Sequence, residues 1–478
     1  MAPDDIRTMV RHGLARKIDS DEVPLASVDL FPHAEESKRR RRRIGHTRAI
    51  NAALGKDTLQ RVSLPSRRAQ LVQSLAGNWS ISLDFSAFFD AFQLSKEVQM
   101  LHCFRSEGEI FCLTRLPMGQ RQSVEVAQGA TSLLLAFPTP GCVTQSYIDN
   151  VRFVGTRKAV VAAACTFVKR CNSANLRIND IDQRSSDLAT ILNGLAKQED
   201  AWLGLVHDLK HKRVRVGEKS ISKLAAVVKE LRGTTPAYTV AAFFGLLLFG
   251  SSVLRCNVAA HFPTMKFLRR FSKDLAEAPQ RWKQVVTIPP GALDDMLRWA
   301  SEVLANVPVQ IKPNDAPTLI ICVDASAWGW GAICFNVAEG SFHSASVAWT
   351  AEERISIGTD DSVYAEPEAA YRALCRFVNP VKAQVEGTVI SVLTDSVCTV
   401  AAINTGYSPS FAVNRIANRI HQAFGHLAIL ATHIPGVNNP SDGLSRGQVA
   451  EVQAATGLLD SLRQLAGCAT QRPPNVNL

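Results

Sequence analysis

Residues 319–334 read LIICVDASAWGWGAIC, and the place of Asp324 in this stretch decides how the C-terminal part of the chain is interpreted. Five apolar residues precede Asp324, a pattern that predicts a buried strand with an aspartate near its end. The same arrangement recurs in VISVLTDS at residues 389–396, where Asp395 follows a second apolar strand. Both carboxylates are therefore expected to project from strand ends.

Two more acidic residues belong to the same region. Glu366 begins the helix-like run EPEAAYRAL, and Asp442 follows a predicted strand and loop in ATHIPGVNNPSDGLSR. Four carboxylates gathered by one sheet cannot all stay ionised without cations, and two divalent ions ~3.5–4 Å apart would both neutralise them and clamp a phosphodiester. Taken singly, Asp324 and Asp395 also suit strand-to-turn caps, and Asp442 a helix N-cap.

The order and spacing of these four acidic residues resemble those in the ribonuclease H domain of retroelement polymerases, over residues 316–448. The resemblance implies that Asp324, Glu366, Asp395 and Asp442 are catalytic and hold two Mg²⁺ or Mn²⁺ ions, which suit an all-oxygen donor set. It also implies that His433 assists proton transfer or product release. Glu368 competes with Glu366 for the helix position, and Asn438 fits the family's loop.

A second pair of aspartates lies in the N-terminal half. Asp84 stands in WSISLDFSAFFDAF at residues 79–92, and Asp149 in SYIDNVRFVG at residues 146–155. Nucleotidyl transfer needs carboxylates on adjacent strands to position two metal ions around a triphosphate. These two residues satisfy that requirement, although either one alone is also an ordinary polar residue at a strand end.

The N-terminal half resembles the palm of reverse transcriptases over residues 44–204. Six stretches follow the family's order: HTRAIN, SLDFSAFFDAF, RLPMGQRQSVEVAQ, SYIDN, ANLRIND and WLG. The resemblance implies that Asp84 and Asp149 bind metal and that Phe89 is the steric gate against a ribose 2′-hydroxyl. It further implies substrate contacts for Tyr147, Gln128 and Arg48. Arg177 lies near the position of a family lysine.

One position departs from that family. Reverse transcriptases usually carry two aspartates where this chain has Asp149 and then Asn150. An amide carbonyl can still ligate Mg²⁺ but brings no charge, so weaker metal binding at a catalytic Asn150 is expected. Two alternatives follow: a nuclease on a defective palm, or a domesticated, non-catalytic RNA-binding scaffold.

Charge is distributed unevenly along the 478 residues. The whole chain has a net charge of +10, whereas residues 315–448 hold 12 acidic and 7 basic side chains, so the remainder is strongly basic. That contrast suggests a polyanion-binding surface beside a carboxylate-rich site. One run of six cations suits a phosphate-contacting clamp, a nuclear-import signal or a solvated face equally well, and its members are Lys38, Arg39, Arg40, Arg41, Arg42 and Arg43.

The apolar run AYTVAAFFGLLLFGSSVL at residues 237–254 is nearly long enough to span a bilayer. Its two glycines and its serine pair favour a buried core helix over a membrane anchor. The eleven cysteines show no CxxC or zinc spacing, and Cys103 and Cys112 form the nearest local couple. The N-terminus lacks an apolar leader, so an intracellular location, nuclear or cytoplasmic, is expected without disulfides.

The predicted fold is mixed α/β: a right-hand polymerase followed by an RNase H-like α/β domain. We expect an N-terminal arm (1–37), fingers and palm (38–215), thumb and connection (216–314), an RNase H-like domain (315–448) and a C-terminal tail (449–478). The chain would copy RNA into DNA and degrade the RNA of the hybrid, with two Mg²⁺ or Mn²⁺ ions per active site.

The expected partners are an RNA template, RNA/DNA hybrid, dNTPs and other proteins of a retroelement, with no membrane. The stretch HIPGVNNPSDGLSR and the segment FFGLLLFGSSVLRCNVAAHFPTMKFLRR at residues 243–270 resemble elements that use a tyrosine recombinase, of the DIRS or VIPER type. The YIDN sequence favours the VIPER type. No integrase, protease or recombinase motif is present in the sequence.

Overall fold

A computed structural model describes residues 2–35, 40–53, 64–311, 317–337, 339–357, 362–378 and 389–448. The chain divides into two compact units, Met1–Arg213 and Val214–Leu478. Helices and strands are mixed in both units, and each unit has its own apolar core.

The first unit begins with small sheets and short helices. Its elements up to residue 113 are α1 (Pro3–Arg11), β1 (Ala15–Lys17), β2 (Asp29–Glu35), β3 (Arg40–His46), α2 (Arg48–Ala53), α3 (Arg67–Gln73), η2 (Ser74–Ala76), β4 (Trp79–Asp84), η3 (Phe88–Ala91), α4 (Lys96–Gln99), η4 (Met100–His102), β5 (Cys103–Ser106) and β6 (Glu109–Leu113). The rest are α5 (Arg121–Leu134), β7 (Cys142–Tyr147), β8 (Asn150–Gly155), α6 (Arg157–Ser173), α7 (Leu188–Leu195), β9 (Glu199–Trp202) and β10 (Leu205–Asp208), with β11 (Arg213–Val216) at the division between the units.

The N-terminal segment expected as an arm contains regular structure. Ile6 and Met9, one turn apart on α1, are buried in a cluster with residues of β1, β5 and β6, and β1 pairs with β6. Most of the basic run lies in β3, which pairs with β2 in an antiparallel hairpin. Cys103 and Cys112 are register partners across β5 and β6, and both are buried free thiols.

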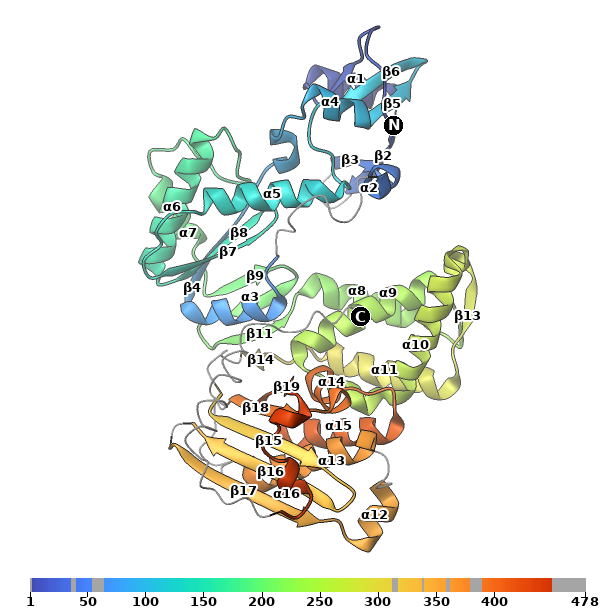
Figure 1. Ribbon diagram of the computed structural model, residues 1–478. Helices are drawn as coiled ribbons and strands as arrows, with labels where there is room; N and C mark the ends of the chain where they lie inside the picture. The colour runs from blue at the N-terminus through green and yellow to red at the C-terminus, as the bar shows by residue number, and fades with distance from the viewer. Residues whose placement is uncertain are drawn as a thin grey trace. The chain divides into compact units, whose positions relative to one another are not determined.

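The centre of the first unit is an antiparallel sheet in the order β4-β8-β7. Helices α5 and α6 pack against it, as Figure 1 shows. Apolar residues of the sheet and of these two helices, including Ile81, Phe153 and Phe167, form one buried core. Burial of these side chains stabilises the sheet on which Asp84 and Asp149 are carried.

A buried charge lies within this sheet. Arg152 on β8 has no exposed surface, and its Nε lies 3.0 Å from Oδ2 of Asp200 on β9. Ser82 on β4 donates a hydrogen bond of 2.6 Å to the same aspartate oxygen. A buried arginine is tolerated only with such partners, so these contacts fix β9 beside β4 and β8.

The second unit starts with a helical segment. It contains α8 (Glu218–Glu230), β12 (Thr234–Pro236), α9 (Ala237–Leu254), η5 (Val258–His261), α10 (Phe262–Glu277), η6 (Pro279–Lys283), β13 (Val285–Thr287), α11 (Pro290–Leu304) and β14 (Val309–Gln310). Helix α9 is the apolar run noted above, long and apolar enough to cross a membrane by length and composition, and half of it is buried. Val240, Phe243 and Leu247 place it in a core shared with α8, α10 and α11, as expected for a core helix.

The remaining elements form a five-stranded sheet with helices. They are β15 (Leu319–Ala325), β16 (Gly329–Asn336), β17 (Ser341–Ala348), α12 (Ala351–Ile357), α13 (Ser362–Val378), β18 (Val389–Thr394), α14 (Val397–Thr405), α15 (Phe411–Phe424), β19 (Ala428–His433), η8 (Gly436–Asn438) and α16 (Asp442–Ser445). The strand order is β17-β16-β15-β18-β19. The first three strands are antiparallel, whereas β15, β18 and β19 run parallel.

Both faces of this sheet are covered. Helix α13 packs on β15, and the core on its side includes Ile321, Val392 and Phe424. Short helix α16 packs against β15, β16 and β17. Gly331 makes that approach possible, because a Cβ there would lie 2.4 Å from the backbone nitrogen of Ser445.

Candidate functional site

The described residues bring three carboxylates together at one end of the five-stranded sheet. Asp324 lies near the end of β15, and Asp395 directly follows β18. Because these strands are parallel, with Cys322 opposite Leu393, both aspartates lie at the same carboxyl edge. Glu366 reaches them from α13, the helix packed on β15. Ligand atoms of the three side chains all lie within 4.8 Å of one another.

Glu366 is held firmly within this group. It is 6% exposed, and its Oε1 accepts a 3.1 Å hydrogen bond from the backbone N–H of Ala325. Its Oε2 is buried and has no hydrogen-bond partner among the described residues. An orphaned buried oxygen is costly, and a divalent cation would satisfy it. The oxygen-only donor set and this orphaned atom fit Mg²⁺ or Mn²⁺.

Electrostatics point the same way. Burial raises the pKa of Glu366 to about 8, and the carboxylates of Asp324 and Asp395 add to the increase. Burial likewise raises the pKa of Asp324 to about 6, with Asp395 and Asp442 contributing. Without a cation, Glu366 is therefore mostly protonated at neutral pH, and a bound cation would displace that proton.

Glu368, the competing candidate on α13, lies in a different environment. Its two oxygens accept hydrogen bonds from Arg372, at 3.0 Å, and from Arg419, at 2.7 Å. These arginines satisfy both carboxylate oxygens. Of the two glutamates, the cluster contains Glu366.

Asp442 and His433 border the cluster without belonging to the group of three. Asp442, first residue of α16, has a 49% exposed side chain and pairs with Arg446 at 2.8 Å. Ser441 occupies the N-cap position of that helix. His433 is exposed at the end of β19, with Thr394, the residue before Asp395, as its register partner.

Two residues of the loop after β19 contact the cluster, and sequence reasoning missed both. Asn439 is buried, and its Nδ2 donates to the carbonyl of Val323 at 3.0 Å and to Oδ1 of Asp324 at 3.3 Å. A Cβ on Gly436 would lie 2.8 Å from Oδ2 of Asp395. The glycine leaves room for that carboxylate, while the neighbouring Asn438, the loop residue singled out from the sequence, is exposed.

The second candidate centre lies on the sheet of the first unit. Asp84 is the last residue of β4 and is the register partner of Asn150, the first residue of β8. Asp149 precedes Asn150 in the turn between β7 and β8, and its carbonyl accepts a 3.1 Å bond from the N–H of Phe85. The two aspartates are thus placed on neighbouring strands.

This turn is strained and held from α5. Ile148 has a φ of 59°, which an L-residue adopts at a cost. Gln128, buried on α5, accepts a 2.6 Å bond from the Ile148 N–H and donates a 2.8 Å bond to Ser146. Thr131 donates a 2.6 Å bond to the Ile148 carbonyl. Both ends of the Gln128 amide are therefore engaged with the turn that presents Asp149.

Amide groups contact the carboxylates of both aspartates. Asn150 donates to Oδ1 of Asp149 at 2.9 Å, and Asn179 donates to Oδ2 of Asp84 at 3.0 Å. Carboxylate oxygens of this kind suit Mg²⁺, and an amide stands where the sequence comparison expected a third carboxylate. Asn179 lies two residues after Arg177, in the stretch ANLRIND, and was not singled out from the sequence.

The remaining predicted substrate contacts surround this sheet. Phe89, on η3, and Tyr147, at the end of β7, are partly buried, and Arg48 is exposed at the start of α2. Arg43 forms an ion pair with Asp90, the residue after Phe89. Arg40, Arg41 and Arg42 lie in strand β3, and Lys38 and Arg39 lie outside the described residues.

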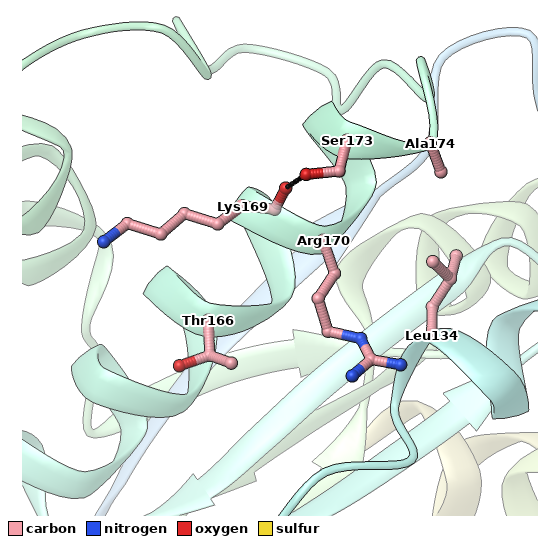
Figure 2. Close-up of a pocket in the computed structure, with 6 residues that line it drawn as sticks. All are labelled: Leu134, Thr166, Lys169, Arg170, Ser173 and Ala174. Atoms are coloured by element: carbon pink, nitrogen blue, oxygen red, sulfur yellow. Dashed lines mark hydrogen bonds between the residues drawn. The ribbon is translucent and has the colours of Figure 1, made fainter.

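One open pocket of about 460 Å³ lies on α6, apart from these carboxylates. Figure 2 shows its lining, which includes Lys169, Arg170 and Leu134. The hydroxyl of Ser173 donates a hydrogen bond to the backbone carbonyl of Lys169. None of the predicted site residues lines it.

Comparison with known proteins places the fold. No family model and no curated protein matches the chain. A foamy viral protease-reverse transcriptase, designated dRH, in complex with double-stranded DNA matches with a TM-score of 0.50 and 14% identity, over 91% of this chain and 70% of that one. A foamy viral protease-reverse transcriptase in complex with RNA/DNA hybrid matches with a TM-score of 0.49 and 14% identity, over 90% and 53%.

The first of these likenesses shows a mixed α/β, reverse transcriptase-like fold over about nine-tenths of the chain. The prediction of that fold is confirmed at this level. The triad of Asp324, Glu366 and Asp395 is a candidate metal site within it.

Proposed function

We propose that the chain is an RNA-directed DNA polymerase with ribonuclease H activity. The observation that carries the proposal is the cluster of Asp324, Glu366 and Asp395, whose ligand atoms lie within 4.8 Å of one another in a chain of reverse transcriptase-like fold. Phosphodiester hydrolysis by paired divalent cations requires such a buried, oxygen-only site.

At the hydrolytic site, the three clustered carboxylates would hold the first cation, and Asp442 would complete the ligands for a second. Mg²⁺ or Mn²⁺, when bound, would supply Lewis-acid activation of the phosphodiester. Asn439 orients Asp324 through its 3.3 Å hydrogen bond. His433, exposed at the end of β19, would assist proton transfer or product release.

At the palm site, Asp84 and Asp149 would hold the cations that accompany a nucleoside triphosphate, and the side-chain carbonyl oxygen of Asn150 would be a weaker third donor. Gln128 positions the turn through Ile148 and Ser146. Phe89 excludes the 2′-hydroxyl, and Tyr147 and Arg48 contact the substrate.

The basic character of the chain outside residues 315–448 supports RNA and RNA/DNA hybrid as partners, since neutralising phosphates releases counterions. The run from Lys38 to Arg43 would contact the backbone phosphates. We assign the chain to a retroelement of the DIRS or VIPER type acting in the nucleus or cytoplasm with other proteins of that element. The segment at residues 243–270 and the YIDN sequence support the element type.

A second candidate function is hydrolysis alone. The amide of Asn150 already donates to Asp149, and Asn150 stands where reverse transcriptases usually carry a second aspartate. If these features abolish metal binding there, the chain would degrade the RNA of a hybrid without making DNA.

The test is primer extension on an RNA template with purified chain, in Mg²⁺ and separately in Mn²⁺, with the RNA strand labelled in the same reaction. Both extension and cleavage are expected. Asp149→Asn should remove extension only, and Asp395→Asn should remove cleavage only, so each variant is the control for the other. Cleavage without extension would establish the second candidate, and neither activity would favour a non-catalytic RNA-binding scaffold.

A further inference from the structure

A single arginine lies beside the fourth carboxylate of the candidate hydrolytic site. Nη2 of Arg446 lies 2.8 Å from Oδ1 of Asp442, and its Nε lies 3.2 Å from Oδ2. The contact is bidentate, so both oxygens of Asp442 are engaged by the guanidinium. A cation approaching Asp442 must share or displace that partner.

Arg446 also influences the buried triad. Its positive charge opposes the increase in the pKa of Asp324 that burial, Asp395 and Asp442 cause. Arg446 is therefore placed to act on Asp324 as well as on its direct partner Asp442.

The backbone around Arg446 is anchored, which makes the pairing a feature of the fold. Ser326 donates a 2.6 Å bond to the carbonyl of Ser445, and Ser346 donates a 2.7 Å bond to that of Leu444. On the other side of Arg446, Gly447 lies against Trp328, since a Cβ there would be 2.8 Å from the indole ring. The side chain itself is 59% exposed and can turn away without unfolding α16.

We propose that Arg446 is an internal counter-cation for the second metal position, kept on Asp442 until nucleic acid arrives. This inference rests on the proposed hydrolytic function. A phosphate of the bound hybrid offers the guanidinium a bidentate partner of the same geometry as the carboxylate. Transfer of Arg446 from Asp442 to phosphate frees the carboxylate for the second cation, so that position binds its cation more tightly when substrate is present.

The expected size of the effect is small but measurable. Ion pairs between exposed side chains are weak, so removing Arg446 should tighten the second metal position about two- to fivefold. The first position uses Asp324, Glu366 and Asp395 and should change less. Arg446→Lys keeps the charge but loses the planar fork, so its second-site affinity should lie between those of the wild type and Arg446→Gln.

The experiment is a Mn²⁺ titration of the full chain, followed by the electron paramagnetic resonance signal of free Mn²⁺. Wild type, Arg446→Gln and Arg446→Lys are compared without nucleic acid and with a hybrid whose RNA strand carries cleavage-resistant 2′-O-methyl groups. Arg415→Gln, which removes an exposed arginine from α15, is the matched control. Circular dichroism checks that each variant is folded.

The proposal expects a weaker second site in the free wild type, tightened by Arg446→Gln and by the hybrid, with no change in Arg415→Gln. An unchanged second site in Arg446→Gln would overturn it. Asp395→Asn separates this failure from that of the proposed function. If the wild type binds a first Mn²⁺ that Asp395→Asn removes, the candidate metal site stands even when Arg446 has no effect; if it binds none, both proposals fail.

Discussion

The carboxylates of the two candidate centres differ in the hydrogen-bond partners that surround them. In the first unit, Asp84 and Asp149 each accept a hydrogen bond from an asparagine amide. In the second unit, Asp324 and Glu366 are buried, and Oε2 of Glu366 has no partner among the described residues. Protein amides can satisfy two partly exposed carboxylates, whereas three clustered ones need protons or cations. The triad should therefore bind metal without substrate, and the palm should depend on the incoming triphosphate.

Asp324→Asn should produce the largest effect. It removes the charge of a buried ligand, and the loss of several kcal/mol of transition-state stabilisation corresponds to a decrease in hybrid cleavage of about a thousandfold. Primer extension by the same variant should be unchanged. Cleavage rates measured with a labelled hybrid test this, and near wild-type cleavage would remove Asp324 from the metal site.

Gly436→Ala should disturb the same site without removing a ligand. The added Cβ would lie 2.8 Å from Oδ2 of Asp395, so the carboxylate must move. A misplaced ligand should lower cleavage about tenfold or more. Gly291→Ala is the matched control, because a Cβ there meets nothing within 4 Å. Equal cleavage by both variants would mean that Asp395 tolerates displacement.

Asn150→Asp tests whether the amide weakens cation binding by Asp84 and Asp149. A third carboxylate would strengthen cation binding, and we expect extension to rise by about threefold to tenfold at limiting Mg²⁺ and little at saturating Mg²⁺. The measurement is the extension rate as a function of Mg²⁺ concentration. A fall in rate at every concentration would show that the site requires the amide hydrogen bond to Asp149.

The last expected effect concerns stability and not activity, and it is a dependence of stability on pH in the absence of cations. Burial raises the pKa of Glu366 to about 8. At pH values between the ordinary pKa of a glutamate and about 8, Glu366 holds a proton in the folded chain that it has released in the unfolded chain. Stability from this group is complete below the ordinary pKa and is lost as pH rises to about 8, by at most about 1.4 kcal/mol per pH unit.

Melting temperatures in a chelator at pH 5.5 and pH 8 measure this dependence. The wild type should lose more stability over that interval than Glu366→Gln, which cannot ionise. Saturating Mn²⁺ at pH 8 should restore the difference, because a cation replaces the proton. Parallel pH dependences of the two proteins would mean that Glu366 is ionised without a cation.

The sequence indicated the clustered carboxylates because strand periodicity and chain position suffice to locate them. Apolar runs before Asp324 and Asp395 predicted strand ends, and the structure brings both together with Glu366. The contacts of Asp442 needed three-dimensional information, although its spacing of four residues from Arg446 is typical of a helical ion pair.

Other parts of the structure depend on contacts between distant segments. Asn439 and Gly436 act through the packing of one loop against two strand ends, which no local pattern encodes. The regular structure of the expected N-terminal arm arises because α1 and β1 pack on β5 and β6, a hundred residues away in the sequence. The one-turn spacing of Ile6 and Met9 was the local sign of that helix.

The most direct test of the difference between the two centres is anomalous scattering from crystals of the chain soaked in Mn²⁺ without nucleic acid or nucleotide. We predict a manganese peak among Asp324, Glu366 and Asp395, and none between Asp84 and Asp149. A peak at the palm pair with none at the triad would contradict the account.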